Sequence, residues 1–346
     1  MALYPVNIRR LLFAALALAA AVFAGQEVSA QPGHTGMVMA LAFSADDGAL
    51  FVTRDHDVVL RSLAAGRTLR TFSGHLSVVT SLAVSPDGRM LLTSSEDGMV
   101  KLWSVETGRV IRELAKGRPG DYSNYQGVLN AVAFSPDGRL AAAGGNAGEV
   151  TVWHVSTGRA ARAFSAEPRA SVQSIAFSGR GASLLVADGV GRVVRWNLAT
   201  GRKIRSFVDD PVSGISSMSV SADGSRVLTV AGLKIRPWDA ASGKELLAFS
   251  EMGKGYYTPQ CVAFTPDGTG AISGDDSRVY SWDLKTGRKL RTLKEPPFSH
   301  VESVAVSHNG EFAAAGDIFG NVRVWRYATG EPLWLEKGRG AEAEAE

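Results

Sequence analysis

The stretch His75–Leu114 reads HLSVVTSLAVSPDGRMLLTSSEDGMVKLWSVETGRVIREL and decides the fold. Four short segments within it alternate apolar and polar residues, which is the pattern of half-buried β-strands. Turns at 86–88, 96–98 and 106–108 separate these segments. Two of the turns contain Asp-Gly, a pair that supplies the positive φ needed in tight hairpins. The stretch therefore predicts one antiparallel sheet of four consecutive strands.

The same unit recurs seven times along the chain. A tryptophan in the third strand marks six of the copies, and an arginine holds the equivalent place in the first. These marker positions lie 42 to 50 residues apart and are Arg61, Trp103, Trp153, Trp196, Trp238, Trp282 and Trp325. A period of about 40–45 residues with four strands per repeat is typical of a propeller. We predict an all-β, seven-bladed β-propeller of four-stranded antiparallel blades, because stacking the sheets around an axis buries both faces of each.

At these residues the chain resembles the WD-repeat β-propeller family. The second copy carries residues that match the structural His-Asp-Ser-Trp network of that family. They are His75, Asp97, Trp103, and either Thr93 or Ser95 as the hydroxyl. The other copies keep the frame and lose parts of the network. The resemblance covers about Met37 to Leu335 and implies the fold, but it leaves the function open because one fold hosts many unrelated sites.

The first thirty residues have the composition of a targeting segment. Arg9 and Arg10 precede an apolar run over 11–25, and a small-x-small pattern ends at Ala30. These features predict a cleaved secretory signal peptide over 1–30 and a periplasmic mature protein. An uncleaved membrane anchor is the alternative. The remaining chain divides into the propeller over 31–338 and an acidic tail over 339–346, which we expect to be disordered.

Two further features concern how the ring is built. Blades one and seven each contain four strands in sequence, so we predict that the ring closes without lending a strand from one end of the chain to the other. Cys261 is the single cysteine and falls in the inner strand of blade six. We expect it to be buried, and no internal disulfide is available to stabilise the exported chain.

Cations recur along the outer strands. The residue after the last turn glycine of each blade is Arg67, Arg109, Arg159, Arg202, Lys244, Arg288 or Glu331. Three residues later come Arg70, Arg112, Arg162, Arg205, Leu247, Arg291 and Trp334. One interpretation is protection of the exposed sheet edges from pairing. The other is a basic belt that makes weak contact with an anionic membrane surface.

The opposite loops carry the aromatic residues. Long connections and turns bring the partner-binding candidates Tyr122, Tyr125, Tyr256, Tyr257, Phe298 and Phe319, with acidic neighbours such as Asp275, Asp276 and Asp317. Aromatic side chains on loops above a rigid ring suit protein recognition, although they also pack loops down. The formal net charge is +3 and becomes about +2 once Arg9, Arg10 and Glu27 are removed. We therefore expect a protein or peptide partner in the envelope, no nucleic acid, and a monomeric ring.

The sequence contains no recognisable catalytic motif, and we predict no cofactor or metal. The six histidines show no metal-ligand spacing, and no nucleophile motif accompanies them. The sequence thus favours a non-enzymatic protein-binding scaffold. Two alternatives remain: a propeller hydrolase or lyase with carboxylates or histidine at the channel mouth, and a peripheral membrane adaptor that uses the basic rim.

Overall fold

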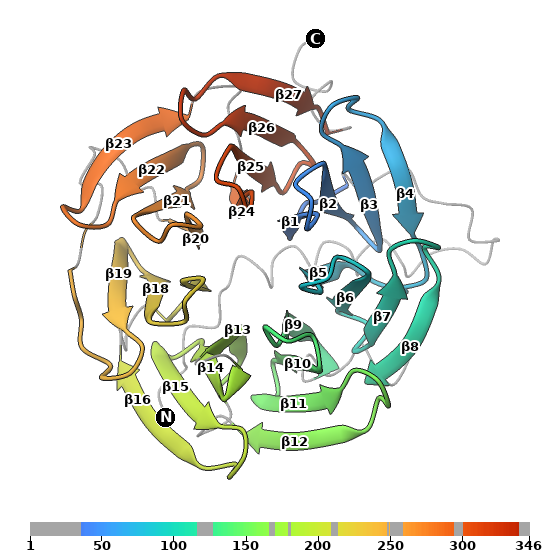
Figure 1. The fold of residues 1–346 in the computed structure, drawn as a ribbon, viewed down its shortest axis with the longest axis vertical. Coiled ribbons are helices and arrows are strands. Elements are labelled where there is room, and N and C mark those ends of the chain that lie inside the picture. The colour runs from blue at the N-terminus through green and yellow to red at the C-terminus, as the bar shows by residue number, and fades with distance from the viewer. Residues whose placement is uncertain are drawn as a thin grey trace, which may run out of the picture. The chain divides into compact units, whose positions relative to one another are not determined.

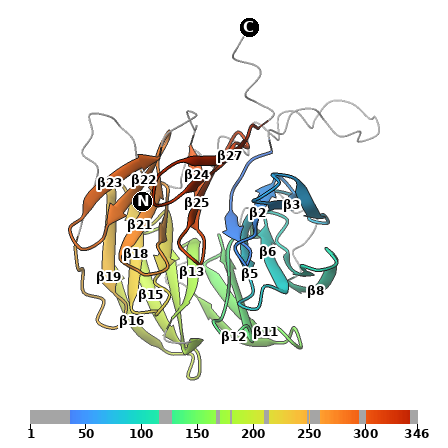
Figure 2. The same cartoon turned by 45° about the horizontal axis from the view of Figure 1, so that its top comes forward.

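The strands form seven separate antiparallel sheets arranged as blades around a central axis (Figure 1). The structure is a computed structural model and describes residues 36–115, 127–165, 170–178, 181–208, 214–247, 249, 259–293 and 300–338. The prediction of an all-β, seven-bladed propeller is confirmed. Turned by 45°, the ring shows β8, β12, β16 and β23 on its outer edge (Figure 2).

Each blade uses consecutive strands, from the innermost to the outermost. Blade one comprises β1 (Leu41–Phe43), β2 (Ala49–Arg54), β3 (Asp57–Ser62) and β4 (Thr68–Phe72); blade two comprises β5 (Val79–Val84), β6 (Met90–Ser95), β7 (Val100–Ser104) and β8 (Val110–Ala115). Blade three comprises β9 (Leu129–Phe134), β10 (Leu140–Gly145), β11 (Glu149–His154) and β12 (Ala160–Ser165); blade four comprises β13 (Val172–Ser178), β14 (Ser183–Asp188), β15 (Arg192–Asn197) and β16 (Lys203–Val208).

The remaining blades follow the same order. Blade five comprises β17 (Ser217–Val220), β18 (Arg226–Ala231) and β19 (Lys234–Asp239). Blade six comprises β20 (Cys261–Phe264), β21 (Gly270–Gly274), β22 (Val279–Asp283) and β23 (Arg288–Leu293); blade seven comprises β24 (Val301–Val306), β25 (Phe312–Asp317), β26 (Val322–Arg326) and β27 (Pro332–Glu336).

Blade five differs from the prediction in its outer strand. Its fourth segment pairs with β19 through two isolated bridges, Ile235 to Phe249 and Trp238 to Glu245, rather than through a continuous ladder. Pro237 lies between these bridges, and its carbonyl accepts a hydrogen bond from the Leu246 N–H at 2.8 Å. A proline has no N–H to return to the outer strand. One ladder bond is therefore absent at this place.

The apolar core is divided into seven layers, each between two neighbouring blades. The layer between blades one and two shows the principle: Phe72 meets Trp103 edge-on, with ring centroids 6.1 Å apart. Trp103 and Trp325 are almost completely buried. Cys261 is a free, buried thiol in the inner strand of blade six, as predicted, and burial raises the pKa of that thiol.

The pairing of the strands shows that blade one has the same register as blade two, although it lacks the tryptophan. Arg61 pairs with Leu50 as Trp103 pairs with Leu91, and a ladder irregularity accompanies both. In place of an indole contact, Arg61 donates to Thr68 Oγ1 at 2.9 Å and pairs with the Glu336 carboxylate of blade seven.

The ring closes without exchanging strands, because β1–β4 form one sheet and β24–β27 form another. The joint between blades seven and one uses the same backbone bond as other joints: Val38 N–H donates to Asp317 O at 3.0 Å, as Val301 N–H donates to Asp275 O at 3.0 Å. Leu41 N–H also donates to Ser303 Oγ of blade seven at 3.0 Å. The predicted unswapped joint is confirmed.

The recurrent Ser-Pro-Asp-Gly sequences make the turns between the first and second strands. In blade two, Ser85 Oγ donates to Asp87 Oδ1 at 2.6 Å and accepts from Met90 N–H at 2.9 Å. Gly88 takes a φ of 70°, which favours glycine. The same arrangement in blade five, where the Ser221 hydroxyl donates to Asp223, lowers the pKa of that carboxyl to about 2. These acidic groups are thus committed to their own turns.

Candidate interaction face

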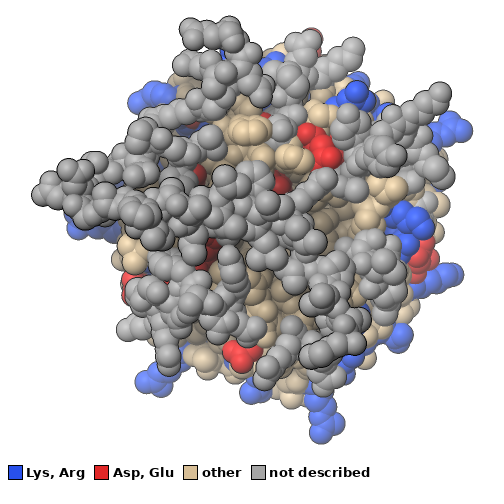
Figure 3. Space-filling model, turned by 180° about the vertical axis from the view of Figure 1, so that it is seen from behind, with Lys and Arg blue, Asp and Glu red and all other residues tan. Residues whose placement is uncertain are grey.

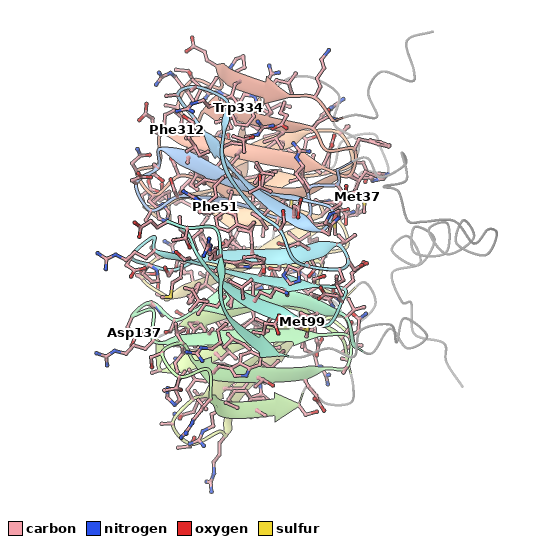
Figure 4. All side chains as sticks on the ribbon, turned by 90° about the vertical axis from the view of Figure 1, so that its right-hand side faces the viewer. Met37, Phe51, Met99, Asp137, Phe312 and Trp334 are labelled. Carbon is pink, nitrogen blue, oxygen red and sulfur yellow. The ribbon has the colours of Figure 1, made fainter. Side chains whose placement is uncertain are left out.

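The strand order gives the ring two different faces. The loop face carries the turns between second and third strands and the connections from each blade to the next. The turn face carries the other two turns of each blade. Figure 4 shows this edge-on, with Met99 of the loop face and Asp137 of the turn face on opposite sides. Five candidates, Tyr122, Tyr125, Tyr256, Tyr257 and Phe298, lie outside the described residues. Phe319 lies in the loop-face turn of blade seven and is 38% exposed.

Two acidic residues of the loop face are buried. Asp275 and Asp317 are the acidic neighbours of the aromatic candidates in the sequence, and both of their side chains lie inside the protein. Asp317 Oδ1 accepts from the N–H groups of Phe319 and Asn321 at 3.0 and 2.8 Å. Asp275 Oδ1 accepts from Ser277 and Arg278 N–H at 2.7 Å each. The carboxylates of these two residues therefore hold their own turns.

The buried carboxylates also affect their neighbours. The hydroxyl of Tyr280 donates to Asp275 Oδ2 at 3.0 Å. Burial, followed by the nearby negative charge of Asp275, raises the pKa of Tyr280 to about 12. In blade four, Asp188 takes the same position and accepts from Val190 N–H, Arg192 N–H and Arg192 Nε. Three loop-face turns are therefore fixed from within.

The tips of the loop face carry exposed apolar side chains. Leu76, Leu233 and Phe319 are 68, 56 and 38% exposed and belong to blades two, five and seven. Phe319 follows the turn that Asp317 fixes. Sequence reasoning found Phe319 but missed the two leucines. For Leu233 the available signal was its position, because Leu233, like Phe319, occupies the turn site that Asp97 holds in blade two.

The blade-two network is assembled completely from buried groups. His75 Nδ1 lies 3.0 Å from Asp97 Oδ2, and His75 Nε2 lies 2.7 Å from Thr93 Oγ1. The indole Nε1–H of Trp103 donates to the same hydroxyl at 2.8 Å. Thr93 rather than Ser95 therefore supplies the hydroxyl. Every polar atom in this chain of bonds has a partner inside the protein, so the arrangement stabilises the blade and leaves no reactive group directed at solvent.

Asp97 anchors that network as a carboxylate. Burial opposes its ionisation, but hydrogen bonds from His75, Leu76 N–H and Met99 N–H outweigh this and lower the pKa of Asp97. The backbone bonds measure 2.9 Å to Leu76 N and 2.8 Å to Met99 N. The side chain thus ties the connection entering blade two to its central turn.

The second series of edge arginines has a role that neither sequence interpretation included. Arg162 Nε and Nη2 donate to the carbonyls of Leu198 and Ala199, in the next blade, at 3.1 and 2.7 Å. Arg291 reaches the carbonyls of Tyr327 and Ala328 in the same way, at 3.1 and 2.6 Å.

Arg112 follows the same pattern in blade two. It donates to Ser156 O of blade three at 3.2 Å and packs so closely on Gly158 that a Cβ there would collide with it. We call these three residues, Arg112, Arg162 and Arg291, the clamp arginines. Their head groups are occupied by the neighbouring blade, which weakens the case for a basic belt built from this series. Seen from the loop face, Lys and Arg side chains project around the outline of the ring (Figure 3).

Two features of the described residues bear on the alternatives. Within the described part of the chain, no group of three or more His, Cys, Asp or Glu side chains is placed to hold a metal ion. Also within those residues, no helix has the length and apolar character needed to cross a bilayer. His300 Nδ1 does approach Asp276 Oδ1 at 2.8 Å on the loop face.

Comparison with known proteins agrees with the fold. Residues 66–104, 120–154 and 254–283 match the family described as WD domain, G-beta repeat. A guanine nucleotide-binding protein subunit beta of Solanum tuberosum is 35% identical over 98 residues, which are 28% of this chain and 25% of that protein. A eukaryotic translation initiation factor 3 subunit I of Aspergillus terreus is 37% identical over 81 residues, 23% of this chain and 24% of that protein.

The matched stretches thus span about a quarter of the length of these curated relatives. Together, the repeat matches and the relatives support a WD-repeat propeller.

Proposed function

We propose that this protein is a non-enzymatic scaffold of the cell envelope that recognises a protein or peptide partner through the loop face. The observation that carries the proposal is the combination of exposed apolar tips and internally fixed turns on that face. Phe319 projects from a turn whose carboxylate accepts two backbone N–H groups. Leu76 follows directly on the buried network of blade two, through its N–H bond to Asp97.

This combination suits binding for a physical reason. Association costs free energy whenever loops and side chains must be ordered, so a surface that is already ordered loses less on binding. Apolar side chains of the size of Leu and Phe then supply the contact area that a partner buries. The loop face meets both conditions at blades two and seven. We expect binding energy to concentrate on these tips rather than on the acidic turns, whose carboxylates are used internally.

The relatives support the same class of function. Both are named as subunits, one of a guanine nucleotide-binding protein and one of a translation initiation factor. A subunit is a component of a larger protein assembly, which agrees with a scaffold. Because only about a quarter of each relative is matched, their particular partners are not transferred to this chain.

The envelope setting rests on the predicted signal peptide over residues 1–30. We expect the mature chain in the periplasmic fraction with an N-terminus at Gln31, measured by cell fractionation and intact-protein mass spectrometry. A chain that keeps its initiator methionine and stays in the cytoplasmic fraction would remove the envelope from the proposal and leave the scaffold function untouched.

The loop face is tested by capture of partners with a matched pair of variants. The loop-face variant carries Leu76→Ser, Leu233→Ser and Phe319→Ser. The control variant carries the same change at three exposed apolar residues of the outer strands, Leu69, Leu290 and Leu333, which are 44, 61 and 38% exposed. We expect the loop-face variant to recover at least tenfold less of the partner that the wild type captures from envelope extract. The control variant should recover as much as the wild type.

A second variant tests the aromatic candidates of the sequence. Tyr256→Ala with Tyr257→Ala should also reduce capture while leaving the melting temperature unchanged. Equal recovery of the same partner by wild type and both loop-face variants would show that recognition occurs elsewhere on the ring.

A further inference from the structure

The described residues of blade three lack the hydroxyl and carboxylate side chains that form the network on the second strand and central turn of blade two. The ladders align the two blades, because Trp103 pairs with Leu91 and Trp153 pairs with Ala141. This alignment places Ala143 at the position of Thr93, Gly145 at that of Ser95 and Ala147 at that of Asp97. Each replacement removes side-chain atoms beside the tryptophan, and none adds any.

The lost side chains leave a cavity of about 190 Å³ between blades two and three. Its lining contains the three replaced positions, Ala143, Gly145 and Ala147, together with Trp153 and Glu149. Ala115, at the end of β8, closes it from blade two. At Gly145 the place of the Ser95 side chain is taken by the Val128 carbonyl, with which a Cβ would collide, so the free space lies beside Ala143 and Ala147.

The indole of Trp153 faces this loss directly. In three other blades the tryptophan Nε1–H donates at 2.8 Å to a hydroxyl on the second strand, supplied by Thr93, Thr229 and Ser273. Ala143 has no hydroxyl, and among the described residues no acceptor lies within hydrogen-bonding distance of Trp153 Nε1. Trp153 is only 7% exposed. Its Nε1 is not among the buried polar atoms that lack a partner, and Trp153 lines the cavity, so this N–H is open to an acceptor on a ligand that replaces water.

We propose that the blade-three cavity binds a neutral imidazole ring. Its volume exceeds the roughly 150 Å³ of an engineered protein cavity that takes up benzene, so one planar ring fits. Blade two shows the template, because there the His75 imidazole lies against Trp103 with ring centroids 5.9 Å apart. In blade three an unprotonated ring nitrogen accepts from Trp153 Nε1–H. The ring N–H is directed to the exposed carboxylate of Glu149, which takes the part that Asp97 plays for His75.

The ring has two natural sources, a free imidazole compound or a histidine side chain of a partner protein. Both use the same contacts, and they differ in whether a peptide backbone must be accommodated at the mouth of the cavity. The site is separate from the exposed tips of the loop face, so its failure and that of the proposed function are independent.

The test follows the indole N–H resonances of the full-length ¹⁵N-labelled protein during titration with imidazole at pH 8. The Trp153 signal is assigned by its loss in Trp153→Phe. We expect a saturable shift of this signal with a dissociation constant of about 1 mM, the affinity class of a ligand with few atoms. Benzene, which has no nitrogen acceptor, should bind at least fivefold more weakly. No saturable shift of the Trp153 signal, or equal binding of benzene, would overturn the proposal.

Two variants with the same chemical change make the test specific. Ala143→Thr restores the hydroxyl found in blade two, occupies part of the cavity and gives Trp153 an internal acceptor. It should weaken imidazole binding at least tenfold. Ala315→Thr makes the same change at the equivalent position of blade seven and should leave binding unchanged. Wild-type affinity in Ala143→Thr would contradict the site, and the melting temperatures of both variants confirm that they are folded.

A second ligand separates the two sources. N-acetylhistidine methylamide presents the imidazole as a protein side chain does. Equal affinity for this compound and imidazole supports a partner's histidine as the occupant. Binding of imidazole alone supports a free compound, and binding of neither overturns the proposal.

Discussion

Replacing Asp97 with alanine tests the blade-two network at its anchor. The carboxylate accepts three hydrogen bonds, from His75 Nδ1 at 3.0 Å, Leu76 N at 2.9 Å and Met99 N at 2.8 Å. His75 is only 4% exposed, so its N–H loses the acceptor and gains no water. One such donor costs about 1–3 kcal/mol, and the two less buried backbone donors add a smaller amount. We therefore expect Asp97→Ala to lower the free energy of unfolding by about 2–4 kcal/mol.

The effect should depend on pH in a defined direction. Because the folded protein lowers the pKa of Asp97, ionisation of this group adds stability at pH values above its unfolded pKa of about 3.9. That contribution is lost as the pH falls through the folded pKa. Asp97→Asn keeps the shape and one acceptor oxygen but has no proton to titrate. The stability difference between wild type and Asp97→Asn should therefore be largest at neutral pH and shrink below about pH 4.

Urea denaturation at pH 7 and pH 3.5 measures these differences, and hydrogen exchange localises them. Amides of residues 75–114 should exchange faster in Asp97→Ala, while those of β18 and β19 (residues 226–239), whose Trp238 bonds to Thr229, should be unaffected. Two results would refute the account of Asp97 as a buried, charged anchor. One is a decrease of less than about 1 kcal/mol in the free energy of unfolding of Asp97→Ala at neutral pH. The other is a stability difference between wild type and Asp97→Asn that stays constant on acidification.

Two other predictions concern the contacts between blades. Arg162→Ala removes two donors to blade four and should lower the free energy of unfolding by about 1 kcal/mol. Arg159→Ala, at an exposed residue just before the same strand, should change it by less than about 0.5 kcal/mol. Equal effects of the two substitutions in urea denaturation would argue against the clamp. Glu336→Gln leaves Arg54 and Arg61 at the closing joint without their shared carboxylate. It should lower the melting temperature, and because salt screens partly exposed charges, the loss should be smaller in 1 M NaCl; a loss that does not vary with salt would contradict the role of charge.

The fold followed from sequence because its signals are local and repeated. Strand alternation and Gly-containing turns specify each sheet, and the spacing of the tryptophans specifies the ring. Even the departure at Arg61 was placed correctly, since register depends on the surrounding pattern rather than on one side chain. Blade five was the exception. Pro237 was visible in the sequence, but its effect depends on which neighbouring strand its missing N–H would have faced.

The features of the candidate face were harder to predict because they depend on the direction in which each side chain points. An aspartate in a turn has the same sequence signature whether it faces solvent or accepts from its own backbone, and Asp275 and Asp317 do the latter. The clamp arginines donate to backbone carbonyls of the next blade, and a carbonyl leaves no mark in the sequence. The blade-three cavity was equally hard to predict, because it forms where small residues of two neighbouring blades lie side by side in the fold.

The blades meet one structural requirement with different residues, and these differences indicate where the ring could bind a ligand. Each blade must fix the turn between its second and third strands next to the neighbouring blade. Blade two does so with a buried network around Asp97, and blades four, six and seven use Asp188, Asp275 and Asp317. Blade three has Gly145 at the place of Asp188, Asp275 and Asp317, and Ala147 at the place of Asp97, so neither position supplies a side-chain acceptor. Because its layer retains Trp153 and the surrounding apolar residues, the sheet still packs while the polar position stays open. Where an internal partner is lost beside an open cavity, an external group of matching shape and hydrogen bonding can take its place, and blade three offers such a position at Trp153.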